Sequence, residues 1–125
     1  MPLVVDAAHG AHLGLTPWLP GRMEGDAVIC SYHKTLPALT QTAGVQVYDS
    51  SLAPKIKRYM DMYETSSPSY VLMNSVAKMA ESVADPAAFE TLQAGLQKLY
   101  KLPLQHLRLI RADDPTKINI STLHC

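Results

Sequence analysis

The amino-acid sequence predicts an α/β fold with a mostly parallel sheet that leads into an α+β unit. Two short apolar runs, residues 2–6 and 27–30, each end in polar residues, as the buried strands of such sheets do. Further along, residues 52–64, 69–84 and 86–101 carry apolar side chains at helical spacing. Strands followed by amphipathic helices indicate one modest core that both kinds of element share.

Length and composition describe an ordinary soluble protein. The chain has 125 residues, enough for about one domain, and its 47% hydrophobic and 18% charged content is typical of a globular fold. Basic and acidic residues number 11 each, so charge favours neither nucleic acid nor an anionic membrane as a partner. The sequence has no apolar run of about 18 residues and no signal peptide, which predicts a cytoplasmic location. Cys30 and Cys125 make no disulfide framework.

The first half of the chain is expected to hold three strands. Residues 2–6 show no alternation of apolar and polar side chains, so both faces of this strand should be covered. Residues 10–26 carry four glycines and two prolines, which predicts an irregular loop. After the strand at 27–30, residues 36–39 turn the chain, and residues 44–48 alternate as a third strand.

The second half is expected to be helical before it ends in two strands. The apolar stripe of residues 52–64 is more typical of core than of a binding site. Asp85 and Pro86 supply a cap and a first-turn proline for the last helix. Residues 107–111 and 117–121 are predicted as two strands joined by a turn.

A lysine follows the second predicted strand directly, behind a serine and a histidine: Ser31, His33 and Lys34. A lysine amine can form a Schiff base with an aldehyde cofactor, while a hydroxyl and an imidazole beside it can hold a phosphate. So short a pattern also arises by chance, and taken alone it describes a polar loop with a solvated lysine.

The first strand ends in Asp6, which small residues and a histidine follow. In a parallel sheet, carboxylates at the C-terminal ends of strands point into the ligand crevice. A carboxylate there can pair with the ring nitrogen of pyridoxal phosphate and keep it protonated. The alternative is that Asp6 caps a turn. His9 and His12 lie nearby, but the glycine between them and the lack of a third ligand argue against a metal site.

Together these motifs resemble consecutive signatures of the Orn/Lys/Arg decarboxylase family, pyridoxal-phosphate enzymes with the aspartate-aminotransferase fold (fold type I). The matching stretches, in order, are residues 3–12 (LVVDAAHGAH), 31–42 (SYHKTLPALTQT), 65–73 (TSSPSYVLM) and 114–120 (DPTKINI). The resemblance implies that residues 1–84 are the C-terminal part of the cofactor-binding large domain and residues 85–125 the start of the small domain. Because such enzymes are several times longer, it also implies a truncated or split segment.

The resemblance also implies an activity, the decarboxylation of arginine, lysine or ornithine to its amine and CO2, as in polyamine biosynthesis. Lys34 matches the Schiff-base lysine, and Asp6 matches the partner of the pyridine nitrogen. Ser31 and His33 match positions that anchor the cofactor phosphate. The methyl group of Ala8 would lie against one face of the ring.

Three further positions carry weaker implications. His9 would sit near the ring substituents, although a plain hydrogen-bonded role in the loop is an equal alternative, and His12 is expected to be structural or on the surface. Thr65 matches a position that approaches the phosphate from the neighbouring subunit, which implies a homodimer or higher homo-oligomer with a shared active site. Without the resemblance, the segment around Thr65 describes a well-capped helix start.

The sequence also departs from the family pattern. Ala7 and Tyr32 differ from the residues common in the family, at positions that flank the implied site. The glycine-rich phosphate loop and the stacking aromatic of such enzymes have no counterpart here, so the chain alone is expected to bind the cofactor weakly. Two alternatives stay open: a non-catalytic remnant or subunit fragment of such an enzyme, and another fold type I lyase or aminotransferase.

Overall fold

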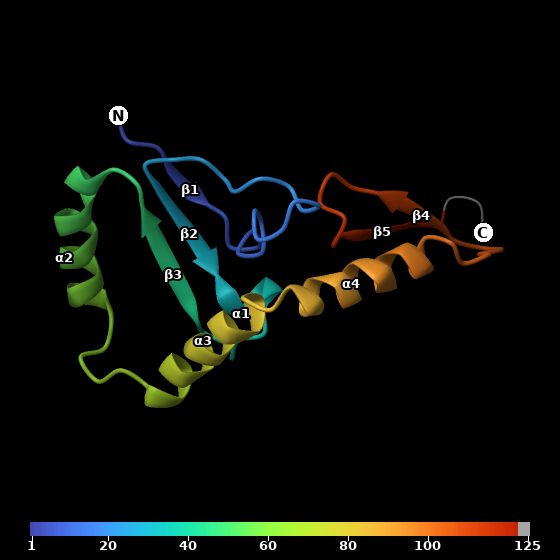
Figure 1. Ribbon diagram of the computed structural model, residues 1–125. Helices are drawn as coiled ribbons and strands as arrows, with labels where there is room; N and C mark the ends of the chain where they lie inside the picture. The colour runs from blue at the N-terminus through green and yellow to red at the C-terminus, as the bar shows by residue number, and fades with distance from the viewer. Residues whose placement is uncertain (123–125) are drawn as a thin grey trace.

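The computed structural model describes residues 1–122, and the first part of the chain builds a three-stranded sheet (Figure 1). Its strands are β1 (Val4–Asp6), β2 (Ala27–Ser31) and β3 (Ala43–Val47), in the spatial order β1-β2-β3. The three strands predicted from the sequence are therefore confirmed, with small shifts at their ends. Turns and bends fill most of the segment between β1 and β2, as its glycines and prolines predict.

The sheet is mixed, which corrects the prediction of a mostly parallel sheet. β1 runs parallel to β2, with Val4 opposite Ala27, whereas β3 runs antiparallel to β2. The connection between β2 and β3 explains the reversal, because a parallel neighbour needs a crossover of about a dozen residues or more, usually a full helix. Residues 32–42 hold only the single turn of α1 (Tyr32–Thr35), so the chain returns beside β2 in the opposite direction.

Asp26 fixes the register of β1 against β2. Its carboxylate accepts a hydrogen bond from the Leu3 amide at 2.6 Å, and its own amide donates to the Leu3 carbonyl at 2.9 Å. The Asp26 carbonyl also accepts the amides of Tyr48 and Asp49, at 2.9 and 3.1 Å. One residue therefore joins the start of β1, the start of β2 and the end of β3.

The buried apolar cluster lies against this sheet and is small. Its members are Ala7, Val28 and Cys30, with Val5, Ala11 and Tyr32 packed around them. β1 does not have two covered faces, because Leu3 is 58% and Val4 54% exposed. The prediction of a strand covered on both faces is wrong within residues 1–122, where β1 is an edge strand with a single neighbour.

Cys30 is a free, buried thiol in this cluster. Burial raises the pKa of Cys30, and the nearby positive charge of Arg22 opposes that change to a smaller extent. The second cysteine, Cys125, lies outside the described residues.

Helices follow the sheet, where the sequence predicts them. A short 3-10 turn, η1 (Ser50–Leu52), leads into α2 (Ala53–Tyr63), and then come α3 (Tyr70–Val83) and α4 (Pro86–Leu99). Figure 1 shows α2 beside the sheet and α3 below it, while α4 continues from α3 away from the sheet to the right.

The starts of α3 and α4 are capped by side chains. The Ser69 hydroxyl accepts the Leu72 amide at 3.4 Å, and the Asp85 carboxylate accepts the Ala87 amide at 3.0 Å. Pro86 occupies the first turn of α4, so the predicted cap and first-turn proline are confirmed. A helix break therefore lies at the predicted domain boundary, and the division into two domains itself stays a prediction.

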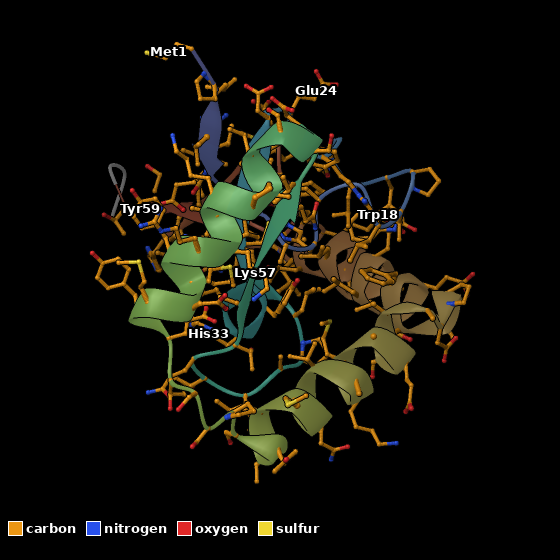
Figure 2. All side chains as sticks on the ribbon, turned by 90° about the vertical axis from the view of Figure 1, so that its left-hand side faces the viewer. Met1, Trp18, Glu24, His33, Lys57 and Tyr59 are labelled. Carbon is orange, nitrogen blue, oxygen red and sulfur yellow. The ribbon has the colours of Figure 1, made fainter. Side chains whose placement is uncertain are left out.

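The apolar stripe of α2 is only half covered, which corrects its assignment to the core. Ile56 and Met60 are partly buried, but Tyr59 is 52% and Tyr63 82% exposed. The two tyrosine rings stack on each other with centroids 6.5 Å apart. Figure 2 looks onto α2, which lies in front of the sheet. Among residues 1–122, no element covers the outer side of this helix.

The described chain ends in the predicted hairpin, formed by β4 (Arg108–Arg111) and β5 (Ile118–Ser121), which pair antiparallel. The hairpin lies over α4, and the loop between β1 and β2 reaches out from the sheet toward it (Figure 1). The Arg111 guanidinium lies over the Tyr100 ring, 4.5 Å from its centroid. None of the helices in residues 1–122 has the length and hydropathy that a membrane crossing requires.

Candidate functional site

A cleft opens at the ends of β1 and β2 and brings together four of the residues that the sequence singles out. Its volume is about 370 Å³. The four are Asp6, Ala8, His9 and Lys34, and the remaining lining residues are Ala7, Gly10, Leu13 and Met23. The strand end that carries Asp6 and the turn that carries Lys34 therefore face one space, although 27 residues separate them in the sequence.

The end of β1 holds Asp6 at the rim of this cleft. Asp6 lies opposite Ile29 of β2, and the next amide, that of Ala7, donates to the Ile29 carbonyl at 2.8 Å. Ala7 is buried, which anchors the backbone, while Asp6 stays exposed. The Asp6 carboxylate accepts the Ala8 amide at 3.0 Å. This bond uses one oxygen of Asp6 in the turn, as the alternative interpretation of a turn cap predicts, and the other oxygen has no hydrogen-bond partner within residues 1–122.

Lys34 reaches the same cleft because β2 turns directly into α1. The Ser31 amide donates to the Ala8 carbonyl at 3.3 Å, so the last residue of β2 is tied to the loop that follows β1. The Leu36 amide donates to the Tyr32 carbonyl at 2.9 Å and closes the single helical turn. Lys34 is exposed, and none of the carboxylates in residues 1–122 forms an ion pair with it. No carboxylate of the described chain therefore holds the Lys34 ammonium group in place.

The two candidate phosphate anchors, Ser31 and His33, do not line this cleft. His33 Nδ1 donates to the Thr42 carbonyl at 2.9 Å, and the Ser31 side chain makes no capping bond at the start of α1. A carbonyl only accepts hydrogen bonds, so the proton of a neutral His33 ring is on Nδ1. Figure 2 places His33 at the lower end of the sheet. Nε2 of a neutral His33 ring is then a hydrogen-bond acceptor.

Thr65 lies apart from the other candidates. It is exposed in the turn between α2 and α3, where its hydroxyl accepts the Ser67 amide at 3.2 Å. Figure 1 shows this turn at the far end of α3 from the strand ends that form the cleft. Within one chain, Thr65 therefore does not contribute to the cleft.

A buried polar cluster close to the cleft gives His12 its structural role. His12 is 4% exposed, and its Nε2 lies 2.9 Å from Asp114 Oδ2 and 3.2 Å from the Thr116 hydroxyl. The Thr116 hydroxyl and amide donate to Asp114 Oδ1 at 2.7 and 3.0 Å. The cluster fastens the C-terminal hairpin to the loop after β1. His12 is thus structural, which is one of the two roles that the sequence predicts for it.

The same contacts set the charge of Asp114. Partial burial raises the pKa of Asp114, but hydrogen bonds from Thr116 and the bond and charge of His12 together outweigh it. The pKa of Asp114 therefore lies below its ordinary 3.8. A carboxyl group with a lowered pKa adds stability that is fully present above its ordinary pKa and is lost as the pH falls through the folded value.

Replacing Asp114 with alanine should lower the free energy of unfolding by about 1–3 kcal/mol, because it leaves the buried His12 Nε2–H and the Thr116 donors without their acceptor. Urea unfolding at neutral pH measures this loss. The exposed neighbour Asp113 provides a matched control, and its replacement by alanine should have little effect. The difference between wild type and the Asp114 variant should shrink as the pH falls below 3.8. An equal loss in both variants would contradict the assigned role.

Sequence reasoning missed part of the cleft wall. Leu13 and Met23 come from the irregular loop, and no local pattern predicts where such side chains point. Asp114 and Thr116 belong to residues 114–120, one of the stretches that carry the family resemblance, so the sequence did mark them. Their contact with His12 was not predictable, because His12 lies 102 residues from Asp114 in the sequence. Among residues 1–122, no group of three or more His, Cys, Asp or Glu side chains is placed to hold a metal ion.

Comparisons with known proteins cover nearly the whole chain. A family model described as "Orn/Lys/Arg decarboxylase, major domain" matches residues 1–122. The chain is also similar to the uncharacterized protein YaaO of Bacillus subtilis (strain 168), with 37% identity over 81 residues. That alignment covers 61% of this chain and 17% of the Bacillus protein, so the chain matches only a small part of its relative.

Proposed function

The chain belongs to the Orn/Lys/Arg decarboxylase family, and we propose that it serves the pyridoxal-phosphate-dependent decarboxylation of a basic amino acid. One observation carries this proposal: Lys34 and Asp6 line the same cleft, and Ala8 and His9 line it as well. A pyridine aldehyde needs an amine for covalent attachment and a carboxylate to keep its ring nitrogen protonated, and this cleft offers both groups.

The residues of the cleft fit that cofactor. A volume of about 370 Å³ lies within the range of small-molecule sites, about 300–1,000 Å³. Within residues 1–122, one carboxylate oxygen of Asp6 has no hydrogen-bond partner and Lys34 has no ion pair. Ala8 offers a small apolar surface in the same lining. When bound, pyridoxal phosphate supplies an electron sink for the bond that releases CO2.

Each residue then has a distinct task. Lys34 would hold the cofactor covalently and give way to the amine of the substrate. Asp6 would stay ionised against the ring nitrogen and hold a proton there, and its hydrogen bond to the Ala8 amide fixes the orientation of the carboxylate in advance. Ala8 would set the plane of the ring by contact, and His9 would border its substituents from the exposed side of the cleft.

The phosphate would be held mainly outside this cleft. Ser31 offers a hydroxyl that makes no capping bond, and His33 offers Nε2, which can donate only when the ring is protonated because Nδ1 already donates to Thr42. Thr65 lies in the turn between α2 and α3, away from the cleft of its own chain. We therefore propose that it contacts the cofactor phosphate in the site of a second copy. The proposed active unit is therefore a homodimer or a higher homo-oligomer.

The proposal is tested by adding pyridoxal phosphate to the 125-residue chain, reducing with borohydride and mapping the modified peptide by mass spectrometry. The expected label is on Lys34. In parallel, amine release from arginine, lysine and ornithine is measured with and without cofactor. A label spread over the exposed lysines of α2 and α4 would overturn the assignment of Lys34. Labelling of Lys34 without turnover would instead favour the non-catalytic alternative.

A further inference from the structure

The helical turn that carries Lys34 has little to hold it in place by itself. α1 is only four residues long, and so short a helix is not stable on its own in water. Ser31, the residue that precedes it, makes no side-chain capping bond, and none of the four residues of α1 is buried. The place of Lys34 therefore depends on the contacts that α1 makes with the rest of the chain.

Tyr32, the first residue of α1, makes several of these contacts. Its amide donates to the Thr42 carbonyl at 3.0 Å, and its carbonyl accepts the Leu36 amide at 2.9 Å. Its side chain packs against the buried apolar cluster of the sheet. Tyr32 thus joins α1 to the sheet through the backbone and through the aromatic ring.

The ring of Tyr32 lies over β3 at a position that has no side chain. Gly44 pairs with Cys30, so a side chain at position 44 would lie on the covered face of the sheet, where Cys30 is buried. A Cβ atom at position 44 would lie 2.8 Å from Tyr32 Cζ and closer still to the Tyr32 hydroxyl oxygen. Carbon atoms of separate residues pack at about 3.5–4.0 Å. The ring therefore fits this place because residue 44 is glycine.

The Tyr32 ring also borders a cavity of about 170 Å³. Leu36 and Gln46 line this cavity as well, and so do Met79 and Ala80 of α3. A ring that is displaced from its place over Gly44 has this space to enter. An added methyl group at position 44 is therefore expected to move the ring and not to unfold the sheet.

We infer that the placement of the Tyr32 ring over Gly44 positions Lys34 for reaction with the cofactor in the cleft that holds Asp6. Lys34 follows Tyr32 by two residues in the same helical turn, so a displaced ring shifts α1 and moves the amine relative to the cleft. Tyr32 and Gly44 are positioning residues, because neither lines the cleft. The inference rests on the proposed function of Lys34, whereas the placement of the ring does not require the cofactor.

Gly44→Ala tests this inference in the whole chain with added pyridoxal phosphate. The rate at which Lys34 is labelled, measured by borohydride trapping and mass mapping, should fall about 100-fold, the cost of moving a reacting group by about 1 Å. The matched control is Gly95→Ala in α4, where a Cβ atom would have no neighbour within 4 Å beyond its own helix backbone and its chain neighbours. Labelling of Lys34 should be unchanged there. Equal rates in the two variants would overturn the inference.

A double-variant cycle with Tyr32→Ala separates positioning from a general loss of structure. Tyr32→Ala alone should slow the labelling of Lys34 about as much as Gly44→Ala does. In the Tyr32→Ala chain, Gly44→Ala should change the rate by less than about twofold, because the ring that it would displace is absent. Additive effects of the two substitutions would contradict the inference. All rates are measured under conditions in which urea unfolding shows each variant to be folded.

NMR of the chain without cofactor distinguishes this inference from the proposed function. We expect nuclear Overhauser contacts between the Tyr32 ring protons and the Gly44 α protons, and a shift of the Lys34 amide resonance in Gly44→Ala but not in Gly95→Ala. If these signals are found and Lys34 is not labelled in the wild-type chain, the proposed function fails and the placement of α1 by Tyr32 stands. Absence of the contacts, or an unshifted Lys34 amide in Gly44→Ala, would overturn the inference whether or not the cofactor binds.

Discussion

Replacing Lys34 with alanine is expected to abolish covalent capture of pyridoxal phosphate by the chain. The reason is that Lys34 is the one lysine among the lining residues of the cleft that also holds Asp6. The measurement is the visible absorption of the chain with added cofactor, followed by borohydride reduction and mass mapping. The effect should be complete rather than graded, because no other amine in that cleft can replace the lost one.

The matched control for this substitution is Lys55→Ala, at an exposed lysine on α2 that does not line the cleft. It removes the same chemical group and charge and should leave the absorption band and the labelled peptide unchanged. A band that persists in the Lys34 variant, or a label that moves to another lysine with equal yield, would refute the role of Lys34. Circular dichroism of both variants establishes that loss of capture is not loss of fold.

Replacing Asp6 with asparagine should separate attachment from turnover. Asparagine keeps a side-chain oxygen that accepts the Ala8 amide, so the turn at the end of β1 should survive, while the negative charge beside the ring nitrogen is lost. Lys34 should still be labelled after reduction. Turnover of arginine, lysine or ornithine should fall by about 100- to 1,000-fold, or about 2.7–4 kcal/mol of transition-state stabilisation.

The control here is Asp61→Asn on α2, where the carboxylate pairs with Lys57 in an exposed i,i+4 ion pair. Such pairs contribute little to stability, and turnover should be unchanged. If the Asp6 variant kept wild-type turnover, the carboxylate would be a turn cap only. That result would leave Lys34 as the proposed covalent anchor and would contradict the proposal that Asp6 keeps the ring nitrogen of the cofactor protonated.

Local sequence patterns predict the elements of this fold well. The strands and helices follow apolar runs, helical spacing and caps such as Asp85 with Pro86, all of which act between neighbouring residues. The errors concern what lies beside an element. The direction of β3 follows from the length of its connection, and the exposure of Val4, Tyr59 and Tyr63 depends on which other surfaces are present to cover them. Such long-range facts leave no trace in a local pattern.

The candidate site divides in the same way. Asp6 and Lys34 were predicted from their places at the ends of two strands together with the family resemblance, and the structure brings both to one cleft. Two other contacts were not predictable: the hydrogen bond from the Ser31 amide to the Ala8 carbonyl and the bond between His12 and Asp114. Each joins distant segments, and no local pattern in either segment indicates its partner. The tasks assigned to Ser31, His33 and Thr65 stay predictions.

The two hydrogen bonds between Asp26 and Leu3 hold β1 and β2 in one register, and the side of the sheet on which Asp6 lies depends on that register. Side chains alternate along a strand, so a slip of one position between β1 and β2 would turn the carboxylate at position 6 to the opposite side of the sheet. A change at Asp26, which does not line the cleft, would then separate Asp6 from Lys34 although both residues remained in the sequence. Chains that keep the lysine and the aspartate but lose the hydrogen bonds between Asp26 and Leu3 would be expected to retain the sequence signature and to lack the shared cleft on which the proposed function rests.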